Sequence, residues 1–252
     1  MKIFITGGSG FVGGAFIKAN AKTHEIFAMS RSEASDEKLN TLGAKPIRCS
    51  LNNIKATDLQ GCKTIIHCAA YVEEWGNWTD YEQINIEGTR QILGIAKRAG
   101  VKRFIHMSTE ATLFHGQHMR KIDETYPLAL RSPFPYSRTK AQAEKLVKEA
   151  NDNADKFTTI SLRPRMIWGP DDQTILPIIR DMARSGKFTW IDGGRVMTST
   201  THIANLVSAM GLALTHGTGG EAYFILDEDD IKIRDFLSQY LATAGVDLGN
   251  KS

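Results

Sequence analysis

The sequence contains few cysteines and lacks any long apolar run. Its three cysteines, Cys49, Cys62 and Cys68, form an odd set without metal-ligand spacing, so we expect reduced thiols and no metal site. No apolar stretch approaches the roughly 18 residues of a membrane-spanning helix. The N-terminal segment MKIFITGG runs straight into an expected strand and leaves no room for a signal peptide. We therefore expect a cytoplasmic protein with no membrane partner.

The sequence also lacks a strong excess of one charge. It carries 31 Lys and Arg residues against 28 Asp and Glu residues, and the basic residues are spread beside acidic ones. A nucleic-acid-binding protein is expected to show a basic patch, so we expect no nucleic-acid partner. The remaining composition is that of an ordinary globular protein, and 252 residues suffice for one large domain, alone or with a small lobe.

Short β-branched runs alternate with longer segments of helical spacing. Because the expected strands are continuous apolar runs, they predict a parallel sheet with helices on both faces, an α/β fold. The expected strands are 3–6, 25–29, 46–48, 64–67, 103–107 and 158–162. The expected helices are 11–19, 36–42, 81–99 and 137–150.

The character of the chain changes after Pro164. Prolines and tryptophans interrupt the following stretch, and shorter elements come after it. These are a half-buried helix at 203–214, a strand at 222–226 and a helix at 231–243. We therefore predict one domain over 1–165, to which later segments return, and a small C-terminal lobe, mainly substrate-binding, over 166–252.

A glycine-rich loop lies between the first expected strand and the first expected helix. Gly7, Gly10 and Gly13 follow a GxxGxxG pattern, with Phe11 and Val12 opening the helix. Such glycines permit the tight turn, the close approach of a pyrophosphate and the packing of helix on strand, and the helix N-terminus attracts an anion. An ordinary glycine-rich turn is the alternative. The strand–turn–helix context favours a dinucleotide site and a Rossmann-type doubly wound sheet.

The end of the second expected strand bears on cofactor preference. NAD-binding sites of this kind usually place an acidic residue there, bonded to the ribose 2′-hydroxyl. This chain has Ser30 and Arg31 instead, and arginine pairs well with phosphate. We therefore predict that NADP(H) is preferred and that NAD(H) is possible. The alternative is that Arg31 is a solvated loop residue.

Tyr136 and Lys140 form a YxxxK pair at the start of an expected helix. The i, i+4 spacing puts both side chains on one helical face, where a cation favours the phenolate. The pair suits proton transfer to or from a carbonyl or alcohol, although a surface Tyr–Lys pair is the alternative. Ser108 and Thr109 close the fifth expected strand, at the edge where open α/β sheets bind ligands.

Several motifs occur together in the order of a known family. They are TGGSGFVG, His67-Cys68-Ala69-Ala70, Asn85 with Gly88-Thr89, Ser108-Thr109, YSRTK and RPRMIWGP. In these motifs the chain resembles the extended short-chain dehydrogenase/reductases of the NAD-dependent epimerase/dehydratase group, and within it the 3β-hydroxysteroid dehydrogenase-like branch. The resemblance spans residues 1 to 240.

The resemblance implies roles for individual residues. Tyr136 matches the catalytic tyrosine, and Lys140 matches the lysine that also holds the nicotinamide ribose. Thr109 matches the catalytic hydroxyl, with Ser108 as second choice.

The resemblance also implies supporting and cofactor-lining residues. Ala69 and Ala70 match backbone that lines the cofactor, and Asn85 matches a helix position that supports the site. Pro164 and Ile167 match the loop beside the nicotinamide.

The chain departs from the family pattern in three places. Cys49-Ser50-Leu51 stands where an Asp-Leu pair often touches adenine, which puts that contact in doubt. Glu110 occupies the place of a dehydratase acid, but Ala111 breaks the usual acidic pair, so Glu110 reads as a structural or substrate-edge residue. The chain also ends soon after Gly245-Val246-Asp247, where relatives often continue.

Aromatic residues suggest the substrate side of the site. Tyr71, Trp75 and Trp168 are candidate wall residues together with Glu110, although any single aromatic is more often part of a core. We favour a small apolar or cyclic alcohol or ketone over a nucleotide sugar.

The sequence therefore predicts an NAD(P)-dependent dehydrogenase or reductase acting on a secondary alcohol or ketone. One alternative is a nucleotide-sugar epimerase or dehydratase with tightly bound NAD, and a second is a non-catalytic dinucleotide-sensing protein. The resemblance further suggests a homodimer packed through the helices at 81–99 and 137–150.

Overall fold

The computed structural model describes residues 1–73 and 76–249, and it divides into two compact units. The sheet unit comprises Met1–Arg163 and Val207–Phe224. The small unit comprises Pro164–Leu206 and the residues from Ile225 onward. The sheet unit thus includes a segment, Val207–Phe224, that lies far along the chain from its other residues.

The sheet unit is built on a seven-stranded sheet in the order β10-β6-β5-β4-β1-β2-β3. Adjacent strands from β6 through β3 pair in parallel. The strands are β1 (Lys2–Thr6), β2 (Glu25–Ser30), β3 (Lys45–Arg48), β4 (Thr64–His67), β5 (Arg103–Met107), β6 (Thr158–Pro164) and β10 (Glu221–Ile225). The order reverses between β1 and β4, which confirms the predicted Rossmann-type fold and places its ligand crevice at their carboxyl ends.

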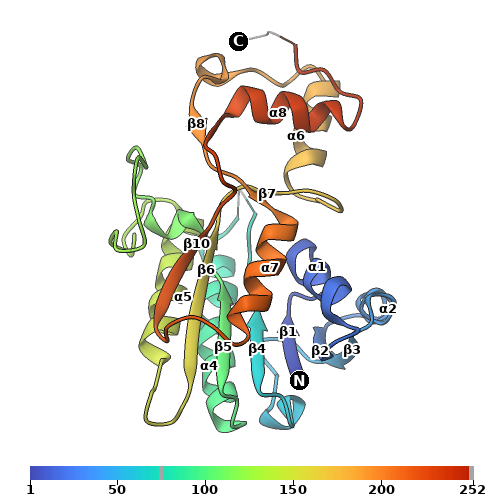
Figure 1. Cartoon of the computed structure of the whole chain (residues 1–252), viewed down its shortest axis with the longest axis vertical. Helices are drawn as coiled ribbons and strands as arrows, with labels where there is room; N and C mark the ends of the chain where they lie inside the picture. The colour runs from blue at the N-terminus through green and yellow to red at the C-terminus, as the bar shows by residue number, and fades with distance from the viewer. Residues whose placement is uncertain (74–75, 250–252) are drawn as a thin grey trace. The chain divides into compact units, whose positions relative to one another are not determined.

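Helices cover both faces of this sheet (Figure 1). They are α1 (Phe11–Asn20), α2 (Glu33–Leu42), α4 (Gly88–Arg98), α5 (Pro135–Ala150) and α7 (Ile203–Ala213), with short helices η1 (Ala56–Leu59) and η3 (Glu110–Leu113). On one face, α4 and α5 bury a core that includes Phe4, Ile65 and Phe104. Because side chains alternate along a strand, Arg103 points to the opposite face, where it donates to the carbonyl of Ala213 in α7.

The helix expected over 81–99 has three parts. It begins as α3 (Trp78–Tyr81), widens into a π-helical segment, η2 (Glu82–Glu87), and continues as α4. π-Helical turns inside helices are frequent at functional sites, because they rotate a side chain out of the regular register. Here the widened segment carries Asn85, which is 2% exposed.

The small unit contains elements that the sequence did not predict. They are β7 (Ile167–Trp168), α6 (Ile175–Arg184), η4 (Ile191–Gly194), β8 (Met197–Thr198), β9 (Thr201–His202) and β11 (Ile231–Lys232); α8 (Ile233–Ala242) corresponds to the expected last helix. Its core is aromatic and includes Trp190, Phe236 and Tyr240. Across the described part of the chain, each helix falls short of the length or hydropathy that crossing a bilayer requires.

Candidate active site

The loop between β1 and α1 is a tight backbone cradle. Gly7 has φ +69°, and a Cβ there would lie 2.8 Å from the backbone nitrogen of Ala69. A Cβ on Gly13 would lie 2.3 Å from the carbonyl oxygen of Gly7. The amide of Gly10 donates to the same carbonyl at 3.1 Å. Only glycine fits the first and third positions, so the loop can lie close to a ligand.

The first turn of α1 is suited to a pyrophosphate. Gly10 is its N-cap, and Phe11 and Val12 follow as half-buried residues. Within the described structure, no side chain caps this terminus and its first turn carries no acidic residue. The first N–H groups of the helix therefore remain available to an anion, and the cradle fits a dinucleotide.

A chain of hydrogen bonds fixes the backbone at the end of β4. Thr6 accepts from the amide of Ala69 at 3.1 Å and donates to His67 Nδ1 at 2.7 Å, because the hydrogen bond to Thr89 described next places the His67 proton on Nε2. His67 Nε2 then donates to Thr89 at 3.1 Å, and Thr89 donates to the carbonyl of Asn85 at 2.7 Å. This order requires neutral His67 with its proton on Nε2. Burial, followed by the charge of Lys140, lowers the pKa of His67 to about 3. The half-buried residues after β4 are Cys68, Ala69 and Ala70.

The ends of β2 and β3 carry charges of both signs. Ser30 is buried and donates to the carbonyl of Ser32 at 3.1 Å, whereas Arg31 is exposed. Arg48, at the end of β3, is hydrogen-bonded to Asp36. The neighbouring Ser30 hydroxyl and the Arg48 guanidinium lower the pKa of Asp36. A carboxylate and two arginines thus lie where the adenosine ribose is expected, and the preference for NADP(H) stays a prediction.

Tyr136 and Thr109 come together across α5 and the end of β5. The phenol lies beside the hydroxyl of Thr109, which lowers its pKa. Burial and the nearby Glu110 carboxylate raise that pKa more strongly, in that order. Thr109 donates to Glu110 at 2.8 Å and accepts from the amide of Ala111 at 3.2 Å. The phenol therefore stays protonated at neutral pH, which suits a proton donor.

Lys140 lies one turn further along α5 and is 3% exposed. Its ammonium donates to the carbonyl of Met107 at 2.7 Å. Burial lowers the pKa of Lys140 to about 8, and Glu144 and then Cys68 act in the opposite direction. At neutral pH Lys140 is thus a buried cation whose pKa, about 8, lies close to the pH of the solution.

Asn85 connects the π-helical segment η2 to the helix α5. It accepts from the amide of Tyr71 at 2.7 Å and donates to the carbonyl of Tyr71 and to Thr139, both at 3.1 Å. The Tyr71 ring packs edge-on against Tyr81 at a centroid distance of 4.8 Å. The backbone of Tyr71 is therefore held by Asn85, and its ring contributes to local packing.

The other predicted residues fall outside the sheet unit or outside the described residues. Pro164, Ile167 and Trp168 belong to the small unit. The indole of Trp168 donates to Asp227 at 2.9 Å and packs edge-on against Tyr240. Trp168 is thus a packing residue of that unit, and its role at a substrate stays a prediction. Trp75 lies outside the described residues.

Sequence reasoning missed a buried polar cluster beneath the site. Ser108 turns its hydroxyl inward and donates to Glu144 at 2.5 Å. Arg163, at the end of β6, forms an ion pair with Glu144 at 2.5 Å, and each side chain is 4% exposed. A usable signal was present, because Glu144 continues the i, i+4 spacing of Tyr136 and Lys140 along one helical face.

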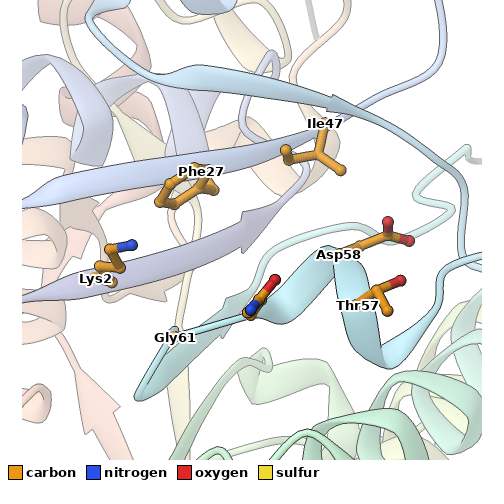
Figure 2. A pocket seen from close by; sticks show the side chains of 7 residues that line it. Lys2, Phe27, Ile47, Thr57, Asp58 and Gly61 are labelled. Carbon is orange, nitrogen blue, oxygen red and sulfur yellow. The ribbon is translucent and has the colours of Figure 1, made fainter.

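A surface hollow of about 530 Å³ lies away from these residues. It is formed between the strands β1 to β3 and the segment 57–61 (Figure 2), and Lys2, Phe27, Ile47 and Asp58 line it. Lys2 opens β1 and Gly61 precedes β4, so the hollow lies toward the amino ends of these strands. The catalytic candidates lie at the carboxyl ends, and the hollow is a separate feature.

Comparison with known proteins places this geometry among oxidoreductases. A family model, the 3-beta hydroxysteroid dehydrogenase/isomerase family, matches residues 4–252. The chain is 40% identical to a 4-hydroxy-2-methyl-3-oxo-4-farnesyl-3,4-dihydroquinoline-1-oxide ketoreductase of Stigmatella aurantiaca, over 99% of this chain and 76% of the relative. It is 33% identical to a 2-alkyl-3-oxoalkanoate reductase of Stenotrophomonas maltophilia, over 97% of this chain and 76% of the relative.

A solved structure agrees with the fold. The UDP-glucuronic acid 4-epimerase of Bacillus cereus in complex with NAD superimposes with a TM-score of 0.82. The alignment covers 97% of this chain and 84% of the other, at 23% identity. At this identity the likeness concerns the architecture.

Proposed function

Because this chain belongs to the 3-beta hydroxysteroid dehydrogenase/isomerase family, we propose that its sheet unit reduces a ketone to a secondary alcohol, with Tyr136 as proton donor. The protein is an NAD(P)-dependent oxidoreductase of the extended short-chain type. The observation that carries the proposed direction is the phenol of Tyr136, which lies beside Thr109 with its pKa raised by burial and by Glu110.

Each catalytic candidate has a distinct task. We assign to the Thr109 hydroxyl the orientation of the substrate oxygen, and to the phenol of Tyr136 the donation of the proton to that oxygen. Lys140 supplies a cation one helical turn away, fixed by the carbonyl of Met107 at 2.7 Å. Since the phenol is held in its protonated form, it can donate the proton that ketone reduction requires.

The cofactor would be held by the glycine loop and by α1. The bound nicotinamide supplies the hydride, and this chain orients it. Gly7, Gly10 and Gly13 leave space for the pyrophosphate, and the first turn of α1 offers its N–H groups. We further propose that NADP(H) is preferred, because Arg31 is exposed at the end of β2 and Asp36 is already paired with Arg48.

The substrate is proposed to be a small apolar ketone. The two relatives described above are a ketoreductase for a farnesylated quinoline and a reductase for 2-alkyl-3-oxoalkanoates. Both names describe a carbonyl group in a molecule that carries an apolar substituent, farnesyl in one and alkyl in the other. Near Tyr136, Phe134 is 44% exposed and stacks on Phe114 at a centroid distance of 5.0 Å. An apolar surface is thus available next to the proposed proton donor.

A cofactor titration followed by a turnover assay tests this function. We expect NADPH to raise the melting temperature more than NADH does, since a ligand at a hundredfold excess over its Kd stabilises the folded state by about 2.7 kcal/mol. We then expect small 2-alkyl-3-oxoalkanoates to be reduced. Gly13→Ala should abolish the thermal shift, because its new Cβ would meet the carbonyl of Gly7.

Gly211→Ala is the matched control. Gly211 lies in α7 with no atom within 4 Å of an added Cβ among the described residues, so cofactor binding should persist. Absence of a thermal shift with either cofactor would contradict the proposal. Conversion of a nucleotide sugar without net cofactor consumption would instead favour an epimerase.

The proposed homodimer meets an electrostatic obstacle. The exposed residues of the segment 81–99 are Glu82, Gln83, Arg90, Gln91, Lys97 and Arg98. Those of the segment 137–150 are Arg138, Lys145, Lys148 and Glu149. Basic residues outnumber acidic ones, and a twofold axis would bring like charges together. We therefore expect any dimer through these helices to be weak and strengthened by added salt, as sedimentation measurements would reveal.

A further inference from the structure

A buried ion pair lies directly beneath the proposed active site. Glu144 accepts two hydrogen bonds from Arg163 Nε, at 3.2 and 3.1 Å, and a third from Nη2 at 2.5 Å. Both side chains are 4% exposed. Burying two charges is costly, and such a pair is often no more stabilising than packed apolar residues. Its presence in a sheet core therefore calls for a reason beyond stability.

The pair is connected to both sides of the catalytic centre. Tyr136, Lys140 and Glu144 follow one another at i, i+4 spacing along α5, so they share the face that meets the sheet. Glu144 also accepts from the hydroxyl of Ser108 at 2.5 Å. Ser108 stands between Met107, whose carbonyl holds Lys140, and Thr109, which lies beside the phenol.

The surroundings of Lys140 hold few other charges. Glu144 and the phenol of Tyr136 lie on its own helix, and Arg163 approaches from β6 through Glu144. The loop after β4 contributes the thiol of Cys68. The strands β4 and β5 contribute His67 and His106, whose pKa values are lowered by burial so that both are neutral at physiological pH.

We propose that the Glu144–Arg163 pair is a positioning device that holds Lys140 as a cation and, through Ser108, fixes the strand end that carries Thr109. Glu144 supplies the negative charge that a buried ammonium needs, and Arg163 keeps that carboxylate ionised and in place. The catalytic part of this inference rests on the proposed function, whereas its electrostatic part concerns the protein alone.

Substitutions of Glu144 and Arg163 should shift the pKa of Lys140 in opposite directions, because the two side chains carry opposite charges. Glu144→Gln keeps the shape but removes the negative charge and leaves Arg163 uncompensated, so Lys140 should lose its proton more easily. Arg163→Gln leaves the carboxylate unopposed, so Lys140 should hold its proton more tightly. Because an opposite charge at close range typically shifts a pKa by about 1–3 units, we expect shifts of about one pH unit in each direction. Removing both charges should bring Lys140 back toward its original behaviour.

Carbon-13 NMR titration of the lysine side chains measures this directly in the protein without cofactor. Lys140→Met assigns the resonance, which should titrate well below those of the exposed lysines. We expect the titration midpoint of Lys140 to fall in Glu144→Gln, to rise in Arg163→Gln, and to return toward the wild-type value in the double variant. If Arg163→Gln does not fold, the comparison of Glu144→Gln with the double variant still decides. Midpoints that stay fixed, or that move in the same direction in both single variants, would overturn the inference.

Turnover measurements separate this inference from the proposed function. In ketone reduction, the alkaline limb of the kcat profile should move to lower pH in Glu144→Gln and to higher pH in Arg163→Gln. Ser108→Ala keeps both charges, so it should lower kcat a few-fold without moving the limb. If wild-type protein reduces no ketone while the NMR midpoints shift as stated, the proposed function fails and the electrostatic part stands. If kcat falls equally in all variants and its pH profile does not shift, the Glu144–Arg163 pair has only a structural role and the inference is wrong.

Discussion

The two units of the molecule hold buried or half-buried carboxylates in different ways. In the sheet unit, Glu144 is balanced by a cation, Arg163, and is held beside a second buried cation, Lys140. In the small unit, Asp227 receives hydrogen bonds from uncharged donors, which include the amide of His202, the indole of Trp168 and the hydroxyl of Thr200.

Asp172 follows the pattern of Asp227. It accepts from the amides of Thr174 and Leu176 and from the hydroxyl of Tyr240. In the small unit a buried carboxylate thus ties loops and helix starts together. In the sheet unit it controls the charge state of a neighbour. The same chemical group serves architecture in one unit and proton chemistry in the other.

The largest expected effect comes from two tyrosines, Tyr136 in the sheet unit and Tyr240 in the small unit. Tyr136→Phe should lower kcat by about 10²–10⁴-fold, since it removes the proton donor. Its melting temperature should stay near that of the wild type. Tyr240→Phe removes a hydroxyl that donates to Asp172 at 3.0 Å, so it should cost about 1–2 kcal/mol of unfolding free energy and leave kcat unchanged. Activity assays and urea unfolding of both variants measure kcat and the unfolding free energy. An equal loss of activity in both variants would contradict the assignment of proton chemistry to the sheet unit alone.

The two units should also lose stability in different pH ranges. Burial lowers the pKa of His67 to about 3 and that of His106 well below 6.5, so the unfolded chain takes up protons first as pH falls below 6.5. Each histidine then removes up to about 1.4 kcal/mol per pH unit from the unfolding free energy. Hydrogen bonds lower the pKa of Asp172 and Asp227 below 3.8, so their contribution is complete above that value and is lost only as pH falls through the folded-state values.

His106→Leu tests the first of these ranges. Neither ring nitrogen of His106 has a hydrogen-bond partner among residues 1–73 and 76–249, so an apolar side chain of similar size should raise stability and flatten its slope between pH 6.5 and 4. The measurement is the melting temperature as a function of pH. His118→Leu, at an exposed position, is the control and should leave the slope unchanged. If the pH dependence of the melting temperature is unchanged in His106→Leu, His106 does not cause the loss of stability expected below pH 6.5.

A last expected effect is local to the small unit. Asp227→Asn turns an acceptor of several hydrogen bonds into a group that is half donor, and should cost about 1–3 kcal/mol. Hydrogen exchange should increase around Trp168 and His202, while the sheet unit keeps its protection. Asp229→Asn is the matched control at an exposed position nearby. Loss of protection spread evenly over both units would mean that they unfold as one.

Much of the fold followed from pattern alone. The strands at 64–67 and 103–107 coincide with β4 and β5, because continuous apolar runs bounded by turns leave little freedom of register. The small unit was harder to predict. The helix α6 has no residue that is fully buried, and two-residue strands such as β7 carry no periodic signal.

The candidate site was also predictable only in part from the sequence. The predicted pair of Tyr136 and Lys140 could be placed on one helical face, because i, i+4 spacing is local information. The choice between Ser108 and Thr109 could not be settled locally, because neighbouring residues on a strand point to opposite sides. The structure turns Ser108 inward to Glu144 and leaves Thr109 beside the phenol.

The sequence by itself determined the glycine-rich loop, the succession of strands and helices in the sheet unit, and the spacing of the tyrosine and lysine, because each depends on residues close together in the chain. Only the tertiary structure decided that Glu144 and Arg163 meet beneath Lys140 and that His67 is held neutral between Thr6 and Thr89. These residues lie 19 to 61 positions apart in the chain. Their charge states depend on burial and on one another, which no local pattern encodes.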